Sequence, residues 1–394
     1  MANLTLISNP GSASRKYALY DGEKCLAKLH FEVIDRQIIC TLKRPGQEPL
    51  KLEENLSHLT FAGSQLSEIL TANNLIGAND NVKRIALRTV APSAYFQQDR
   101  LLSKDGLKRL KDLEPEASIH VHASLQEANI LATEFPQATL VAISDSAFHA
   151  GKPDRAKYYS IPLDDAKKLG IVRYGYHGLS AESVVSQFGE DIKLPTRTII
   201  AHLGGGASLT ALQNGQSIDN TMGYSPLEGL VMATRSGDID ATAVEALRRS
   251  LKLDAQQFAD YLNDRSGLLG VSGASSDIPI LLKLEAEGHQ GAKLALELYV
   301  YHVAQAVGRM TVALGGLDAL VFTGTVGERS AEIRRRVIKQ LHFLGLELNP
   351  HLNHQTLAPA ELTQLGTSRH PVKIYVAPAN EDLVMAKHAA KITK

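Results

Sequence analysis

Two similar patterns of alternating apolar and polar residues lie about half a chain apart. The first begins with the strand-like run Leu4–Ile7, turns at residues 9–14, continues over Lys16–Tyr20 and turns again at Asp21-Gly22. An Asp-Gly pair between two alternating segments is a strong signal for a β-hairpin. The pattern therefore predicts that the chain opens with a hairpin whose first turn consists mainly of small residues.

The second pattern repeats this plan. A strand-like run at Thr198–Ala201 leads into the turn His202–Gly206, and a second run ends at the turn Asn214-Gly215. Tyr17–Glu23 aligns without a gap with Thr210–Gln216. Such an internal repeat predicts two domains built on one plan, and a chance likeness between two hairpins is the alternative.

The rest of the pattern alternates between further strands and helices. Apolar residues at helical spacing indicate the helices, and short continuous apolar runs indicate the buried strands. They predict helices at residues 103–113, 122–134, 241–252 and 287–314, one after Glu328 with Ile333, Val337 and Leu341 on one face, and a terminal helix opened by residues 380–382. The predicted strands are Arg84–Val90, Leu140–Ser144, Leu317–Thr323 and Val372–Val376.

Composition narrows the function classes. The chain has 394 residues, 44% of them hydrophobic, with 42 Lys and Arg against 42 Asp and Glu. A chain without net charge or a basic run gives little support for binding nucleic acid or a membrane surface, and no apolar run is long enough to cross a bilayer. With no secretory signal, we expect a cytoplasmic protein of two domains. Cys25 and Cys40 form neither a disulfide framework nor a metal-site pattern.

The stretch Gly229–Asp240 carries the first candidate chemistry. Arg235 lies just before a predicted helix for which Asp240 is a good N-cap residue. The N-terminus of a helix attracts anions, and a guanidinium there is suited to a phosphoryl oxygen. A salt bridge from Arg235 to Asp238 or Asp240 is the structural alternative.

Two further polar residues follow predicted turns or strand ends. Asp145 ends a buried-type strand, where sites in open sheets gather, although it could simply cap the turn before His149. His177 lies between two glycines before a helix that Ser180 is expected to cap, and an exposed, idle histidine is the alternative.

Two glycine turns are candidate phosphate sites, because backbone N–H groups can approach a ligand where no side chain blocks them. One is Gly204–Gly206, which is followed by a strand and is therefore not a dinucleotide fingerprint. The other is Gly324–Glu328, which lies between a predicted strand and a predicted helix.

Six segments together resemble the acetate kinase family, in order along the whole chain. They are Asn9–Ser14, Tyr174–Gly178, His202–Gly206, Ser225–Asp240, Ser266–Ser272 and Phe322–Gly324. The block Thr-Arg-Ser-Gly-Asp-Ile-Asp at residues 234–240 is the most specific of them.

The resemblance implies a fold and a reaction. The fold is the α/β, duplicated actin-like ATPase fold of the acetate and sugar kinase, heat-shock chaperone and actin superfamily, with two domains around a cleft. We expect an N-terminal domain at residues 1–145, completed by the helix 381–394, and a nucleotide-binding domain at 146–380. The implied reaction is phosphoryl transfer between ATP and a short-chain carboxylate such as acetate, by a homodimer that uses Mg²⁺ or Mn²⁺.

Roles for individual residues also follow from the resemblance. The implied catalytic residues are Arg88, Asp145, His177 and Arg235. The implied nucleotide or phosphate contacts are Ser12, Ser14, His202, Gly204, Gly205, Gly206, Asp277, Gly324, Thr325, Gly327 and Glu328, and the implied metal contacts are Asn9 and Glu381. A carboxylate is already a nucleophile, so such a site must offset the repulsion between two anions and needs no general base.

Several positions depart from the family pattern. Ala91-Pro92-Ser93 replaces His-Gly-Gly, residues 119–125 replace a proline-rich stretch, and Ala181, Pro279 and Arg329 replace a histidine, an arginine and an asparagine. The first two changes predict a differently shaped wall beside Arg88, which leaves a propionate, butyrate or other short-chain carboxylate kinase as the first alternative. A non-catalytic nucleotide-binding relative is the second, but a pure binder would not need both Arg88 and Arg235.

Overall fold

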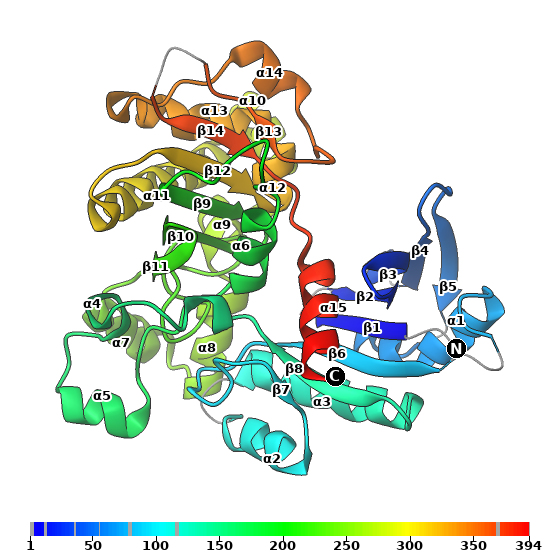
Figure 1. Ribbon diagram of the computed structural model, residues 1–394. Helices are drawn as coiled ribbons and strands as arrows, with labels where there is room; N and C mark the ends of the chain where they lie inside the picture. Colours follow the sequence, from blue (N-terminus) through cyan, green and yellow to red (C-terminus); the bar gives the residue numbers. More distant parts are fainter. Residues whose placement is uncertain are drawn as a thin grey trace. The chain divides into compact units, whose positions relative to one another are not determined.

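The computed structural model describes residues 4–11, 14–34, 37–54, 56–77, 81–114, 118–367 and 371–393. These residues form two compact units, each with its own β-sheet and helices (Figure 1). Unit 1 contains the described residues up to Ala147 and those from Asn380 onward, and unit 2 extends from Phe148 to Ala379. The chain therefore passes between the units twice.

The sheet of unit 1 contains eight strands within the described residues, in the order β5-β4-β3-β2-β1-β6-β8-β7. The predicted N-terminal hairpin is confirmed, because β1 and β2 pair antiparallel from Leu4 opposite Asp21 to Pro10 opposite Arg15. On its other edge β1 pairs parallel with β6, which pairs parallel with β8. The strands are β1 (Leu4–Pro10), β2 (Ser14–Asp21), β3 (Lys24–Ile34), β4 (Gln37–Lys43), β5 (Leu50–Glu54), β6 (Val82–Thr89), β7 (Arg100–Leu101) and β8 (Thr139–Ser144).

Helices of unit 1 cover this sheet. The C-terminal helix α15 packs against β1, β6 and β8, and α3 packs against β6 (Figure 1). One apolar core cluster includes Leu6, Leu19, Phe31 and Leu131. The helical segments are η1 (Leu59–Gln65), α1 (Leu66–Ala72), α2 (Lys104–Asp112), α3 (Ser118–Glu134) and α15 (Glu381–Ile392), and η2 (Ala147–His149) spans the first passage between the units.

The sheet of unit 2 has the order β11-β10-β9-β12-β14-β13. Here too an antiparallel hairpin, β9 with β10, leads on one side to a parallel pairing of β9 with β12 and of β12 with β14. The series β11-β10-β9-β12-β14 thus has the same order and strand directions as β3-β2-β1-β6-β8 in unit 1. The strands are β9 (Arg197–Leu203), β10 (Ala207–Gln213), β11 (Gln216–Asn220), β12 (Ala319–Thr323), β13 (Thr363–Gln364) and β14 (Lys373–Val376).

The helices of unit 2 include the predicted long helix, α11. It packs against β9, β10 and β11, whereas α6 covers Ile200 and Val321 of the sheet. The helical segments are α4 (Asp154–Lys157), α5 (Leu163–Leu169), α6 (Gly178–Val185), α7 (Ala241–Leu251), α8 (Ala255–Asp264), α9 (Gly267–Ser272), α10 (Ile278–Ala286), α11 (Gln290–Leu314), α12 (Gly324–Arg329), α13 (Ala331–Gln340), η3 (His342–Leu344) and α14 (Pro350–Gln355). Among the described residues, no helix combines the length and the apolar character that a membrane crossing requires.

Candidate active site

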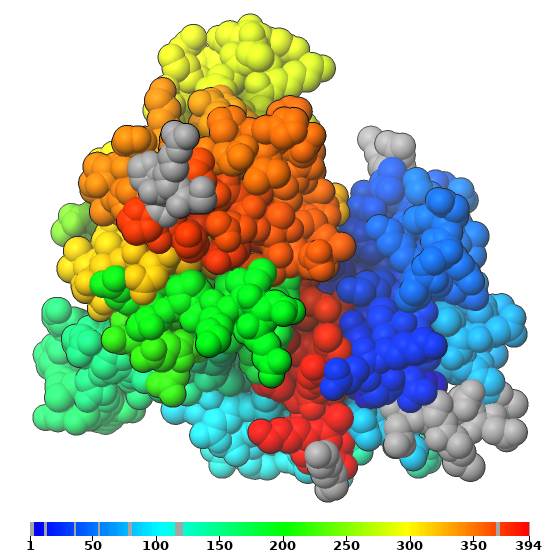
Figure 2. All heavy atoms as spheres, turned by 45° about the horizontal axis from the view of Figure 1, so that its top comes forward, coloured from blue at the N-terminus to red at the C-terminus, as the bar shows by residue number. Residues whose placement is uncertain are grey.

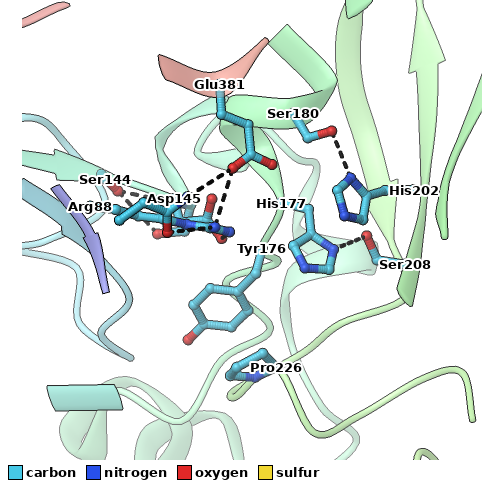
Figure 3. A network of polar contacts seen from close by, with 12 residues as sticks. Arg88, Ser144, Asp145, Tyr176, His177, Ser180, His202, Ser208, Pro226 and Glu381 are labelled. Atoms are coloured by element: carbon cyan, nitrogen blue, oxygen red, sulfur yellow. Dashed lines mark hydrogen bonds and ion pairs between the residues drawn. The ribbon is translucent and has the colours of Figure 1, made fainter. Parts of the chain in front are cut away.

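In unit 1, four predicted site residues meet at the carboxyl ends of the parallel strands. Arg88 in β6 lies between the carboxylates of Asp145, just after β8, and Glu381, the first residue of α15 (Figure 3). Its Nη2 lies 3.0 Å from Oδ2 of Asp145, and its Nη1 lies 3.3 Å from Oε2 of Glu381. Nη1 also donates a hydrogen bond of 3.2 Å to Oδ1 of Asn9 near the end of β1. Three residues from other parts of unit 1 therefore converge on one guanidinium.

The charge of Arg88 is well supported. Burial lowers the pKa of Arg88, but the carboxylates of Asp145 and Glu381 outweigh that effect and the net shift is upward. The Asp145 side chain is fully buried, whereas Arg88 and Glu381 retain some exposure. The group therefore holds Arg88 as a cation between two carboxylates, with Arg88 and Glu381 at its partly open side.

The predicted metal contacts belong to the same group. Nδ2 of Asn9 donates to Oε2 of Glu381 over 3.4 Å. Within the described residues, no cluster of three or more His, Cys, Asp or Glu side chains is arranged to hold a metal ion. Of the predicted phosphate contacts in the first turn, the backbone oxygen of Ser14 accepts from the N–H of Gly11, and Ser12 lies outside the described residues.

In unit 2, His177 adopts a left-handed backbone conformation, with φ of 59°, as the N-cap residue of α6. This conformation is unfavourable for a residue with a side chain, so its surroundings must hold it. The preceding peptide is fixed: the carbonyl of Tyr176 accepts from Nε2 of His149 at 3.0 Å and from Nδ2 of Asn220 at 3.3 Å. Nδ1 of His177 then lies 2.9 Å from Oγ of Ser208 in β10.

The expectation that Ser180 caps α6 is wrong. Ser180 lies inside the helix, and its hydroxyl is 2.7 Å from Nδ1 of His202 in β9 (Figure 3). The rings of His202 and His177 lie with their centroids 4.2 Å apart and their planes tilted by 30°. The hydroxyl thus orients the second histidine of an adjacent pair, which a local capping pattern cannot reveal.

Gly206 lies against both His177 and Arg235. A Cβ atom at Gly206 would be 3.1 Å from Nε2 of His177 and 3.1 Å from Nη2 of Arg235. The absence of a side chain therefore leaves open the space that the two polar groups share. Nη1 of Arg235 donates a 2.8 Å hydrogen bond to the carbonyl of Pro226, which fixes its direction.

Tight contacts hold the backbone of the loop at residues 229–240, which carries Arg235. Gly267 has a φ of +60°, and a Cβ atom there would lie 2.7 Å from the carbonyl oxygen of Arg235. The N–H of Ala233 also donates to the carbonyl of Gly205. Asp240 is confirmed as the N-cap of α7, and Asp238 accepts from the N–H of Gly229, so both carboxylates have backbone partners.

A cavity of about 1190 Å³ lies within unit 2. Four predicted nucleotide contacts line it, namely Gly204, Gly205, Asp277 and Thr325, as do the departing residues Pro279 and Arg329. Apolar side chains from α10, α13 and the segment before α14 form much of its wall, which suits a nucleobase. Figure 2 shows the orange outer surface of the segment that contains α13 and α14.

Two charged residues support the cavity through backbone contacts. The expected glycine turn at residues 324–328 is instead the short helix α12, directly after β12. Oε1 of Glu328 accepts from the N–H of Gly324 at 3.1 Å and from that of Ala379 at 3.0 Å, so it holds the start of this helix. Arg334 in α13 is fully buried and donates to four carbonyl oxygens and to Oδ1 of Asn353. Burial lowers the pKa of Arg334 to about 10, so it remains charged at neutral pH.

The altered Ala91-Pro92-Ser93 segment, which is expected to shape the wall beside Arg88, begins with a buried residue. Ala91 is 1% exposed and belongs to an apolar cluster with Leu87, Phe96 and Leu110. The side chain that replaces an imidazole is therefore part of the core of unit 1. Ser93, in contrast, is half-buried, and its hydroxyl accepts from the N–H of Tyr95.

Sequence reasoning missed the residues that position the candidate groups. Asn220 and Arg334 bind backbone carbonyls of residues that are distant along the chain, and no local motif marks them. Pro226 lies within the segment Ser225–Asp240, but the contact of its carbonyl with Arg235 was not expected. The unusual backbone conformation of His177 did have a local signal in the sequence. Glycines on both sides of a histidine indicate an unusual turn.

The two sheets of like topology and the glycine-lined cavity define the actin-like ATPase fold, which many phosphotransferases share. More narrowly, the chain belongs to the acetokinase family, whose model matches residues 4–387.

Individual relatives agree with this membership. The chain is 37% identical to acetate kinase 1 of Neisseria meningitidis serogroup A, over 99% of this chain and 98% of the relative. Among solved structures, it matches an acetate kinase of Porphyromonas gingivalis with a TM-score of 0.85 at 30% identity, and a propionate kinase of Francisella tularensis with 0.89 at 31%. Both matches cover 100% of each chain.

Proposed function

We propose that the chain is an acetate kinase, which reversibly phosphorylates acetate with ATP to give acetyl phosphate and ADP. The observation that carries the proposal is that His177 and Arg235 both lie against Gly206, in the unit whose cavity is lined by Gly204 and Gly205. A nucleotide with its base in the cavity would have its phosphates near these glycines, where both polar groups can reach a transferring phosphoryl group.

The chemistry requires charge neutralisation and alignment. An oxygen of the carboxylate attacks the terminal phosphorus, one P–O bond forms, the bond to the ADP oxygen breaks, and no proton changes place. Arg235, Arg88 and the N–H of His177 offset the negative charge on donor and acceptor, and Asp145 orients Arg88.

In unit 1, Asn9 and Glu381 are the residues that would hold a magnesium ion, and Nη1 of Arg88 contacts an oxygen of each. Glu381 offers a partly exposed carboxylate and Asn9 an amide oxygen, and Mg²⁺ typically takes one or two such groups and fills its remaining positions with water and phosphate oxygens. We propose that these two residues hold Mg²⁺ or Mn²⁺, which when bound would neutralise phosphate charge.

We also propose the domain organisation, the location and the oligomeric state of the protein. The two compact units would be the two actin-like domains, the enzyme would act in the cytoplasm, where ATP is available, and it would be a homodimer. Light scattering coupled to gel filtration tests the last point, because a mass equal to that of one chain would contradict it.

A propionate kinase is the second candidate, favoured by the match to the Francisella structure. A coupled ADP-release assay over formate, acetate, propionate and butyrate distinguishes the two. We expect the highest kcat/KM with acetate and detectable turnover of propionate, since hydrophobic pockets separate neighbouring homologues only about 10–200-fold.

Repeating the series with GTP and pyrophosphate identifies the phosphoryl donor. A rate with pyrophosphate above that with ATP would contradict the nucleotide role of the cavity.

A further inference from the structure

One short segment of unit 2, Gly223–Glu228, holds the groups around the proposed transfer site. We call it the Pro226 segment. Its central carbonyl, that of Pro226, accepts the hydrogen bond from Nη1 of Arg235 over 2.8 Å. The direction of the Arg235 guanidinium therefore depends on where this segment lies.

The same segment also contacts the neighbour of His177. The hydroxyl of Tyr176 donates a 2.7 Å hydrogen bond to the carbonyl of Tyr224. Because Tyr176 directly precedes His177, a displacement of the Pro226 segment would be felt by both polar groups that flank Gly206.

Glu228 anchors the end of this segment. Its carboxylate forms an ion pair with Arg173 and accepts a hydrogen bond from the hydroxyl of Tyr159. Both side chains of the ion pair are largely buried, with 14% exposure for Arg173 and 24% for Glu228. A carboxylate in such surroundings has few alternative positions, so it can fix the chain that carries it.

The two partners of Glu228 are themselves tied to the backbone on either side of the turn. Arg173 donates to the carbonyls of Asn220 at 3.1 Å and Thr221 at 3.3 Å, at the end of β11. The hydroxyl of Tyr159 accepts from the N–H of Tyr224 at 2.8 Å. Gly223 completes the packing, because a side chain there would overlap the Glu228 carboxylate and the Tyr159 hydroxyl.

We propose that Glu228 is a positioning residue for phosphoryl transfer, which acts by fixing the Pro226 carbonyl and through it Arg235. The inference rests on the proposed function and assigns Glu228 no contact with substrate or nucleotide. Glu228 also does not line the cavity in which the nucleotide base is proposed to bind. Its removal should therefore affect turnover more than nucleotide binding.

The test compares Glu228→Ala and Glu228→Gln with the parent enzyme, measuring kcat and KM for acetate and ATP. We expect Glu228→Ala to lower kcat roughly 10–100-fold, because a displacement of about 1 Å in a catalytic group has effects of this size, with KM for ATP changed less than about threefold. Glu228→Gln keeps the volume of the side chain and an acceptor for Tyr159 but loses the charge. Its kcat should therefore lie between that of the parent and that of Glu228→Ala. Glu245→Gln, which removes a carboxylate from an exposed ion-pair cluster on α7, is the matched control.

A double-mutant cycle separates positioning from general structural support. If Glu228 acts through Arg235, adding Glu228→Ala to Arg235→Ala should lower the residual rate less than about threefold, measured with labelled ATP. An equal loss in both backgrounds would overturn the proposal. So would an unchanged kcat in folded Glu228→Ala, or, where that variant does not fold, in Glu228→Gln. A parent enzyme without activity on any carboxylate would instead refute the proposed function.

Discussion

At the scale of single residues, the two proposed catalytic arginines are held in place in different ways. Arg235 is held by the carbonyl of Pro226 and packs against Gly206. Arg88 differs, because side chains hold it: two carboxylates and the amide oxygen of Asn9. The two proposed transition-state arginines should therefore respond differently to mutation, since loss of Arg88 leaves the buried carboxylate of Asp145 without this partner.

Arg235→Ala should abolish most turnover and leave ATP binding largely intact, since the guanidinium neutralises charge that develops during transfer. Comparable arginines contribute roughly 10³–10⁵ in rate. Arg235→Lys should rescue poorly, because an ammonium lacks the planar fork. Steady-state kinetics and ATP titration by calorimetry measure both effects. If Arg235→Ala retains a rate within about tenfold of the parent, the role proposed for this loop is wrong.

Lys152 provides a prediction about pH. It is 5% exposed, and among the described residues its Nζ has no hydrogen-bond partner. Burial, with repulsion from Arg173 and Lys157 opposed by Asp219, lowers the pKa of Lys152 to about 7. The unfolded chain retains the proton up to about pH 10.4, so between these two values the unfolded state binds more protons and the free energy of unfolding rises with pH.

Lys152→Met should therefore stabilise the protein most at pH 7 and below, by at most roughly 5 kcal/mol for a shift of this size, and progressively less as the pH rises toward 10. Urea unfolding at pH 6, 8 and 10 measures the difference from the parent. A gain that is the same at all three pH values would show that the charge of Lys152 is not its cause.

At the scale of elements, local sequence patterns predict the hairpins and helix caps, whereas side chains that bind distant parts of the chain are not predicted. The N-terminal hairpin and the Asp240 cap follow from turn and capping residues, and both are confirmed. Ser180 was misassigned because its partner, His202, comes from a different strand, and no local pattern includes it. The contacts of Arg334 were equally unpredictable, since they reach residues up to 22 positions away.

The segment after β6 gives an element-scale prediction. Because Ala91 is enclosed by Leu87 and Phe96, Ala91→His should lower the free energy of unfolding by about 1–3 kcal/mol through overpacking. Ser93→Gly, at a half-buried position of the same turn, should cost about 1 kcal/mol or less. Denaturant unfolding compares the two. An Ala91→His variant as stable as the parent, but with a changed ratio of kcat/KM for propionate and acetate, would place residue 91 at the acyl site instead.

At the scale of the whole molecule, the two units share a strand plan but carry different chemistry. Unit 1 contributes the guanidinium of Arg88 between Asp145 and Glu381, and unit 2 contributes His177, Arg235 and the cavity. The internal repeat in the sequence anticipated the shared plan, because both hairpins have a first turn rich in small residues and a second turn of the Asp-Gly or Asn-Gly type. It could not anticipate the division of roles, which depends on residues outside the repeat.

The central claim is that the chain transfers the terminal phosphoryl group of ATP directly to acetate. The most direct measurement follows the product by ³¹P NMR in a mixture of enzyme, ATP, Mg²⁺ and acetate, with acetyl phosphate trapped as its hydroxamate in a parallel sample. We predict acetyl phosphate and ADP in equal amounts from the parent enzyme, and neither above background from Arg235→Ala. ADP with inorganic phosphate but no acyl phosphate at any time would contradict the account.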